Sequence, residues 1–142
     1  MSNDYNLERF VAAQVHSYQT ALAEIKNGRK VTHWIWYIFP QIAGLGRSPT
    51  AQHYAIKSLE EAKTYLADPV LGPRLEVCVK TLQALPPTLT AEAIFGETDA
   101  MKLRSCLTLF IEAGAPAIFR EALKRWYHGQ ADSKTLGLLA AR

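Results

Sequence analysis

The sequence predicts an all-α protein, a compact bundle of about six to seven helices, some of them short. Two observations predict this class. Apolar residues recur at three- and four-residue steps along most of the chain, and the segments they mark end at glycine or proline. The second half of the chain contains no alternating strand pattern. We therefore expect a single all-α domain over residues 1–142, with an ordered core from about residue 6 to residue 140.

Length and composition fit one ordinary globular domain. The chain has 142 residues, 49% of them hydrophobic. A chain of this length can bury roughly two thirds of its unfolded surface without a disulfide or a metal. Cys78 and Cys106 lie in apolar helical patterns without a CxxC motif or a histidine cluster, so we expect reduced, buried thiols. The sequence predicts no metal site and no cofactor.

The N-terminus and the charge bear on location and partners. No basic segment precedes an apolar run at the N-terminus, and no stretch approaches the ~18 apolar residues of a membrane span. We expect a soluble, cytoplasmic protein without a membrane partner. The formal net charge is +3, from 16 basic and 13 acidic residues dispersed along the chain, which permits nucleic-acid binding without implying it. The oligomeric state is not predicted.

The first predicted helix runs from Asn6 to Asn27. Its apolar residues follow one stripe, Asn6 can cap it, and Gly28 can end it. Gln14 falls inside the stripe and therefore needs an internal hydrogen-bond partner, whereas His16 points the opposite way and is expected in solvent.

The next segment, Val31–Phe39, is ambiguous. Its β-branched and aromatic residues suit a buried strand as well as a buried helix. A lone strand would have no partner among helices, so we expect a short buried helix, capped by Thr32 and stopped by Pro40.

Caps and stop signals mark the helices in the rest of the chain. Glu121 and Arg125, four residues apart, resemble a surface ion pair on one of them. The expected helices begin at Ser58, Asp68, Thr90, Thr98, Pro116 and Asp132, and the first five end near Asp68, Pro86, Gly96, Gly114 and Gly129.

Most of the candidate chemistry lies in residues 30–48. Two tryptophans, a tyrosine and a phenylalanine are bracketed there by polar residues, and Gly44 and Gly46 permit close backbone approach. Arg47 beside Ser48 offers donors suited to a phosphate or a carboxylate. Aromatic walls with a few donors are typical of a small-ligand pocket, but also of a core next to a solvated turn, and both interpretations stay open. The GxG pattern lacks the strand and third glycine of a dinucleotide-binding fingerprint.

A second polar cluster lies farther along the chain. Thr98, Lys102 and Ser105 share one side of their helix, away from its core face, and Asp99 begins the same helix. A solvated stripe explains this pattern; the alternative is a lysine with hydroxyls facing the aromatic segment. The chain carries no serine-hydrolase elbow, zinc-protease motif or Walker loop.

Several motifs match a known family. They include HWxWxxFPQ at residues 33–41, GLGRS at residues 44–48 and KLxS at residues 102–105. From Leu7 to Leu139 the chain resembles the bacterial domain-of-unknown-function family 1810, whose members sometimes carry a calpastatin-like label. The resemblance implies a compact all-α fold and no established activity. Calpastatin is a disordered inhibitor, whereas this chain is patterned to fold, so we do not expect protease inhibition.

The polar positions of these motifs suggest one site. We predict a pocket for a small polar or anionic, nucleotide-like ligand, with Trp36 and Tyr54 as stacking walls. Arg47 and Lys102 would hold the anion. Whether the protein is an enzyme stays open; the candidate acid and base are His33 and Asp99. The remaining candidate ligand-binding residues are Gln14, Gln41, Ser48 and Ser105.

Two other functions compete with this one. A protein-interaction module would use the aromatics as core and expose an apolar patch elsewhere. Nucleic-acid binding, the weaker of the two, would require Lys26, Arg29, Lys30, Arg47 and Lys57 to merge into one basic face.

Overall fold

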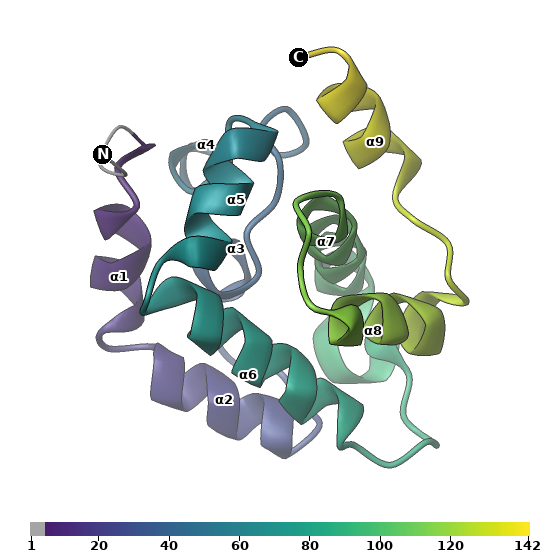
Figure 1. Ribbon diagram of the computed structural model, residues 1–142. Helices are drawn as coiled ribbons and strands as arrows, with labels where there is room; N and C mark the ends of the chain where they lie inside the picture. Colours follow the sequence, from purple (N-terminus) through teal and green to yellow (C-terminus); the bar gives the residue numbers. More distant parts are fainter. Residues whose placement is uncertain (1–4) are drawn as a thin grey trace.

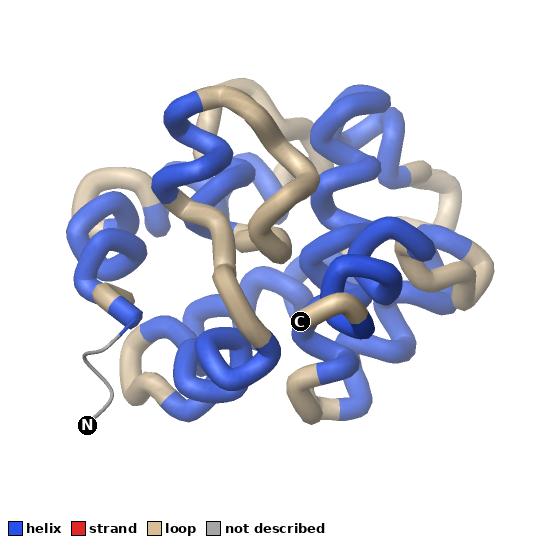
Figure 2. The backbone as a smooth tube through the Cα atoms, turned by 90° about the horizontal axis from the view of Figure 1, so that it is seen from above, coloured by secondary structure: helices blue, strands red, loops and turns tan. Residues whose placement is uncertain are grey.

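The computed structural model describes residues 5–142, and in this range it contains nine helices and no strand (Figure 1, Figure 2). The predicted all-α class is confirmed. The number of helices exceeds the expected six to seven because several are single turns or short segments. The helices are α1 (Glu8–Gln14), α2 (Tyr18–Lys26), α3 (Ile35–Ile38), α4 (Pro49–His53), α5 (Leu59–Ala67), α6 (Leu71–Gln83), α7 (Ala91–Glu112), α8 (Ala117–Tyr127) and α9 (Ser133–Ala140).

The longest helix, α7, is the centre of the bundle. It packs against α3, α5, α8 and α9, while α2 packs along α6 and α1 packs on α3 (Figure 1). Residues Leu103 to Phe110 of α7 are buried with one exception, the half-buried Arg104. The expected break at Gly96 is present as a kink inside α7, where the glycine has φ 80°.

The core is apolar and keeps its thiols protonated. Trp34, Phe39 and Phe110 are at most 1% exposed, and the buried cluster spans both halves of the chain. The predicted free, buried cysteines are confirmed. Burial raises the pKa of the Cys78 thiol to about 12 and that of Cys106 well above its usual range, so neither supplies a thiolate at neutral pH.

The predicted first helix is broken in two between Gln14 and Tyr18. Gln14 is 2% exposed; its Nε2 donates to the carbonyl of Tyr37 at 2.8 Å, and its Oε1 accepts from Arg74 at 3.2 Å. The expectation of an internal partner is therefore confirmed, and His16 is exposed, as predicted. The Asn6 cap is wrong: Asn6 has φ 52°, Leu7 precedes the helix, and no side-chain cap is formed.

The helical interpretation of Val31–Phe39 is confirmed only for its second half, α3. The Thr32 cap is wrong because Thr32 bonds to a carboxylate on another helix. Glu24 of α2 accepts hydrogen bonds from the backbone N–H of Val31 and Thr32, from the Thr32 hydroxyl and from the Trp34 indole, at 2.7–3.0 Å. Burial alone would raise the pKa of Glu24, but these bonds outweigh it and lower the pKa to about 2.

The loop after α3 is tied down by backbone and side-chain bonds. Ile42 and Ile56 form an isolated parallel bridge, with hydrogen bonds of 2.8 Å on either side. Arg9 of α1 is bonded to the carbonyls of His53 and Ala55 and to the buried carboxylate of Glu61, each at 2.8 Å. These contacts fix residues 41–57 against the bundle.

Candidate functional site

A cleft of about 410 Å³ lies between three segments: the loop after α3, the middle of α7 and the start of α9. Six of the ten residues predicted for the site line it. Four come from the aromatic segment and the following loop, and two come from α7. They are Trp36, Gln41, Arg47, Ser48, Lys102 and Ser105.

The other four predicted residues lie elsewhere. Gln14 is buried in the core contacts described above. His33 is exposed and does not line the cleft, so the expectation that it joins Arg47 and Lys102 in a common cleft is wrong. Tyr54 lines a separate small recess together with Trp36, and it packs on Phe10 and Tyr37 with ring centroids 5.8 and 5.2 Å apart.

Asp99, the fourth, lies just outside the cleft and touches it through Lys102. Its Oδ1 is 3.5 Å from the Lys102 ammonium, and its Oδ2 is 2.8 Å from that of Lys30. The Lys102 ammonium also lies 4.9 Å from the centroid of the Trp36 ring, within range of a cation–π contact. A carboxylate that already bridges two lysines is poorly suited to the acid or base role considered for it.

Two glycines let the loop approach its neighbours. A Cβ on Gly46 would lie 2.5 Å from the Cβ of Ala51, and one on Gly44, which has φ 106°, would lie 3.2 Å from Leu138 of α9. A side chain at either position would push the loop away from the bundle. Ser48, at the tip of the loop, caps α4 by accepting from the backbone N–H of Ala51 at 3.1 Å.

The start of α9 is fixed to α7 beside the cleft. Asp132 accepts from the Ser105 hydroxyl at 3.2 Å, and its backbone N–H donates to the Thr108 hydroxyl at 2.9 Å. Arg104 donates to the carbonyls of Gln130 and Ala131 at 2.7 and 3.0 Å. These bonds bring Lys134, on the first turn of α9, to the same cleft.

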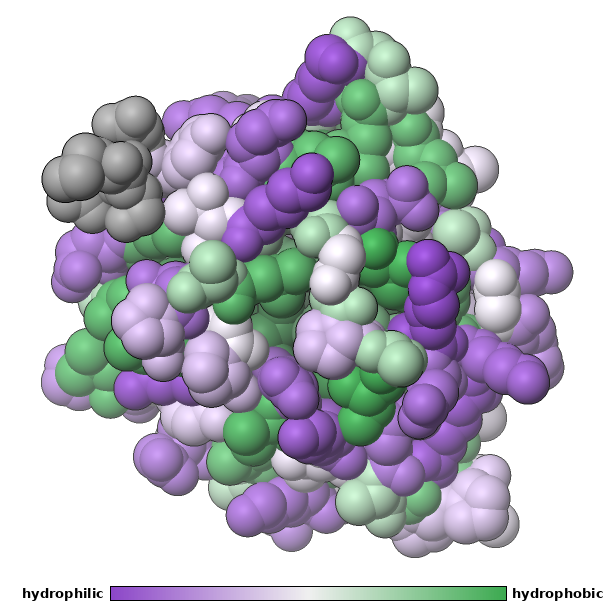
Figure 3. All heavy atoms as spheres, viewed as in Figure 1, coloured by the Kyte–Doolittle hydropathy of each residue, from purple (hydrophilic) through white to green (hydrophobic). Residues whose placement is uncertain are grey.

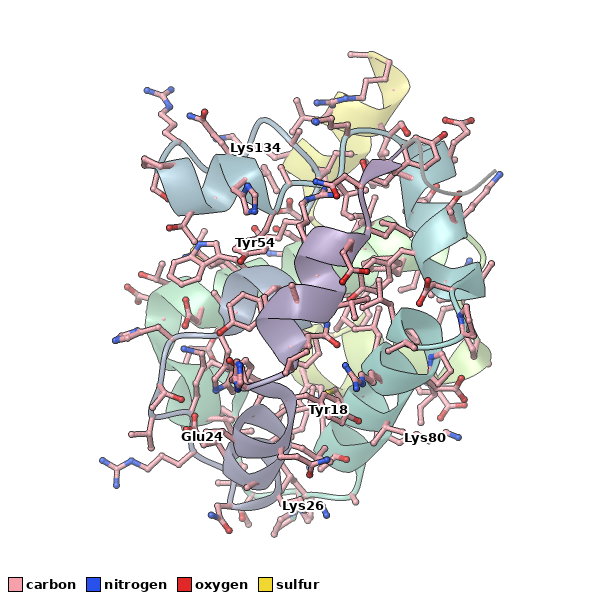
Figure 4. The ribbon with its side chains drawn as sticks, turned by 90° about the vertical axis from the view of Figure 1, so that its left-hand side faces the viewer. Tyr18, Glu24, Lys26, Tyr54, Lys80 and Lys134 are labelled. Carbon is pink, nitrogen blue, oxygen red and sulfur yellow. The ribbon has the colours of Figure 1, made fainter. Side chains whose placement is uncertain are left out.

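The charged lining of the cleft is mostly basic. The lining contains one carboxylate, that of Asp132, and four basic side chains: Arg47, Lys102, Arg104 and Lys134. Arg47 and Lys134 are exposed, and Lys102 keeps 26% of its side chain accessible. In Figure 4, Lys134 and Tyr54 lie in the upper half of the molecule, whereas Glu24 lies in the lower half. The cleft therefore combines an aromatic wall with cations that a solute can reach.

Sequence reasoning missed Arg104, Asp132 and Lys134 as lining residues. Asp132 had a visible signal, since it was expected to cap the last helix and does accept from Thr135 N at 3.1 Å. Its position beside Ser105 depends on how α9 packs on α7, and no local sequence pattern predicts that packing. Lys134 had no signal at all.

No group of three or more His, Cys, Asp and Glu side chains within residues 5–142 could hold a metal ion. None of the helices described there has both the length and the apolar composition needed to cross a bilayer.

Comparison with known proteins supports the resemblance noted in the sequence. The family model described as "Protein of unknown function (DUF1810)" matches residues 4–139, so the chain belongs to this family. A solved structure, the conserved hypothetical protein Rv1873 from Mycobacterium tuberculosis, is similar to it over 97% of this chain and 99% of that one. The two are 43% identical in sequence, with a TM-score of 0.94. No curated protein matches the chain.

Proposed function

We propose that the cleft binds a small anionic, nucleotide-like ligand. The observation that carries this proposal is the meeting of Trp36 with Arg47 and Lys102 in one cleft, although they come from separate segments. Indole faces bind planar rings, and arginine and lysine bind phosphates and carboxylates. A cytoplasmic setting, the location expected from the sequence, would supply such ligands.

The charge balance supports an anion over a neutral or cationic ligand. Four basic residues line the cleft against one acidic residue. Lys102 keeps only 26% of its side chain accessible, so its charge is screened less than the charges of the exposed Arg47 and Lys134. Its volume of about 410 Å³ lies within the range of small-molecule sites, roughly 300–1,000 Å³.

The proposal is for binding, and it assigns no acid or base. His33 is outside the cleft, and Asp99 is engaged by Lys30 and Lys102. Gln41 would offer its amide to the ligand, while Ser48 and Ser105 would act mainly through the structure they hold in place. Trp36 is then the stacking wall, whereas Tyr54 lines a neighbouring small recess and is not part of the proposed cleft.

A thermal-shift screen against nucleotides, ADP-ribose derivatives and phosphorylated metabolites tests the proposal. We expect at least one compound to raise the midpoint of thermal unfolding, and Arg47→Ala to reduce that shift. Arg120→Ala is the matched control, because Arg120 is also an exposed arginine but lies on α8, outside the cleft. Equal shifts in both variants would place binding elsewhere, and the absence of any shift across the screen would reject the proposal.

The competing functions predict different behaviour. An interaction module needs a contiguous apolar patch, but the large exposed apolar residues belong to several elements, and one of them, Met101, lines the cleft. In Figure 3, hydrophobic residues are scattered over this face, at the upper right where Figure 1 places α9 and also in the centre and at the left edge. A basic nucleic-acid face would need Lys30, whose side chain is only 7% exposed and is paired with Asp99.

A further inference from the structure

We infer that Asp132 is a specificity-determining residue of the cleft, which accepts hydrogen bonds from the hydroxyl groups of a sugar. The ligand would then be a phosphorylated compound that contains ribose. This inference rests on the proposed function, because it assigns a second part of the same ligand. Asp132 carries the single carboxylate in the lining of the cleft, and the other four charged residues there are basic.

The side chain of Asp132 is held in a fixed direction. Its Oδ2 accepts from the Ser105 hydroxyl at 3.2 Å, from the backbone N–H of Thr135 at 3.1 Å and from the Thr135 hydroxyl at 2.6 Å. Its own backbone N–H donates to the Thr108 hydroxyl at 2.9 Å. Thr135 is fully buried, so this anchor is shielded from water. A ligand would meet a carboxylate that needs no reorganisation.

The other carboxylate oxygen, Oδ1, has no hydrogen-bond partner among residues 5–142. All the side-chain hydrogen bonds that Asp132 makes within residues 5–142 reach Oδ2, and none reaches Oδ1. Asp132 is half-buried and lines the cleft. An ionised carboxylate oxygen in such a place forms strong, short hydrogen bonds to O–H donors.

Helix capping does not require a negative charge, because Asn and Ser cap helices about as well as Asp. The carboxylate also complements the dipole of α9, which it caps. The same charge lines the cleft, where it can act on what enters. Among the basic residues of the lining, the guanidinium of Arg104 binds the carbonyls of Gln130 and Ala131, and the ammonium of Lys102 is paired with Asp99.

The surroundings select the chemistry of the donor. A phosphate group would be repelled by the Asp132 carboxylate, and an ammonium group would be repelled by the four basic residues. A neutral hydroxyl donor suits both. Ribose offers two adjacent hydroxyls, and acidic side chains bind ribose hydroxyls in dinucleotide sites of other folds. The rest of such a ligand, a base and phosphates, matches Trp36 and the cations of the proposed function.

Calorimetric titrations without divalent metal test this inference. The probes are the four ribonucleoside triphosphates, their 2′,3′-dideoxy counterparts and inorganic tripolyphosphate. We expect at least one ribonucleotide to bind wild-type protein about tenfold more tightly than its dideoxy counterpart, because the dideoxy sugar has no hydroxyl to donate to the charged Oδ1. In Asp132→Asn the amide oxygen can keep the cap while the NH₂ group replaces Oδ1, so the ratio should fall to within about threefold.

The control ligands separate a specificity role from a structural one. Dideoxynucleotides and tripolyphosphate should bind Asp132→Asn as well as or better than wild type, because a repulsive charge is lost. Asp132→Ser, which also provides a capping hydroxyl, is the second variant if the first folds poorly. If either folded variant weakens all three classes of probe equally, Asp132 is only structural and the inference is overturned.

The outcomes also distinguish this inference from the proposed function. If ribonucleotides, dideoxynucleotides and tripolyphosphate bind wild type equally and Arg47→Ala weakens all of them, the anion site stands and the ribose inference fails. If no probe binds wild type, the ribose inference fails, and the thermal-shift screen with its wider set of phosphorylated compounds decides the proposed anion site separately.

Discussion

Trp34 and Trp36 are two residues apart and have similar neighbours, yet they differ in environment. A lysine ammonium lies above each ring, 5.0 Å from the centroid for Lys30 over Trp34 and 4.9 Å for Lys102 over Trp36. Both lysines pair with the same carboxylate, that of Asp99. The chain thus uses one arrangement twice, once inside the protein and once at the cleft.

The two arrangements differ in how completely their polar groups are satisfied. Trp34 is 1% exposed, its indole N–H donates to Glu24 at 2.8 Å, and Lys30 is bonded both to Asp99 and to the carbonyl of Thr32. Trp36 is half-buried, and no hydrogen bond within residues 5–142 reaches its indole N–H. The first set is structural, whereas the second leaves capacity for a ligand.

The largest expected effect is on the inner tryptophan. Trp34→Ala should lower the free energy of unfolding by about 3–5 kcal/mol, the range for large aromatic residues deleted from a core. Trp36→Ala should cost less, about 1–2 kcal/mol, because part of the ring is already exposed. Urea denaturation of both variants measures the difference.

Fluorescence adds an independent readout of this pair. Trp34 and Trp126 are 1% and 8% exposed, so acrylamide should quench mainly Trp36 in the folded protein. Trp36→Ala should remove most of the quenchable emission. Equal costs for the two substitutions, or quenching that survives Trp36→Ala, would contradict the distinction between an inner and an outer tryptophan.

The next largest expected effect concerns Glu24 of α2, whose carboxylate accepts hydrogen bonds from the Trp34 indole and from the backbone of Val31 and Thr32. Its folded-state pKa of about 2 lies below the usual range, so the unfolded chain binds the proton more readily. The stability that Glu24 contributes is present above about pH 4.5 and is lost as the pH falls toward 2. At neutral pH, Glu24→Gln should cost about 1–3 kcal/mol, the usual value of hydrogen bonds to a charged group.

The pH dependence identifies the cause of that loss. The difference in unfolding free energy between wild type and Glu24→Gln should be large at pH 6 and should shrink as the pH is lowered toward 3. Glu121→Gln, an exposed carboxylate on α8, is the control and should change stability little at either pH. A difference that did not depend on pH would mean that packing, and not the charge of Glu24, holds residues 31–34.

Local signals in the sequence predicted the helices and several caps. Ser58 caps α5 as predicted and accepts from the backbone N–H of Glu61 at 3.0 Å, because a capping residue acts on backbone within one turn of itself. Asp68 accepts from the backbone N–H of Leu71 at 2.9 Å, but the predicted start of the helix is wrong by two residues, since Val70 is the N-cap of α6. Such bonds need no knowledge of the rest of the fold. The family motifs then identified six of the residues that line the cleft.

Long-range contacts were not predictable in the same way. Arg125, expected to pair with Glu121 on the surface, instead donates to carbonyls at the end of α6, including those of Leu85 and Pro86 at 2.7 and 2.8 Å. His33 was placed in the site because it is one of the polar positions of the family motifs, but Glu24 holds the preceding residues and His33 is exposed. In each case the partner is distant in the sequence, and its position follows from helix packing.

The smallest expected effects on stability are those that distinguish Lys30 from Lys102. Lys30 lies 2.8 Å from Asp99 and is 7% exposed, whereas Lys102 lies 3.5 Å from Asp99 and is 26% exposed. Lys30→Met should cost about 1–3 kcal/mol of unfolding free energy, as for a largely buried charge removed from a partly buried partner. Lys102→Met should cost less than about 1 kcal/mol, as is usual for accessible ion pairs.

Double-mutant cycles with Asp99→Asn resolve how this carboxylate divides its interaction energy. We expect a coupling of about 1 kcal/mol or more between Asp99 and Lys30, and less than about 0.5 kcal/mol between Asp99 and Lys102. A weak coupling to Lys102 would leave its ammonium available to an anion without a loss of stability. A coupling to Lys102 as large as that to Lys30 would make both lysines structural, and the cleft would then have to bind anions through Arg47 and Lys134 alone.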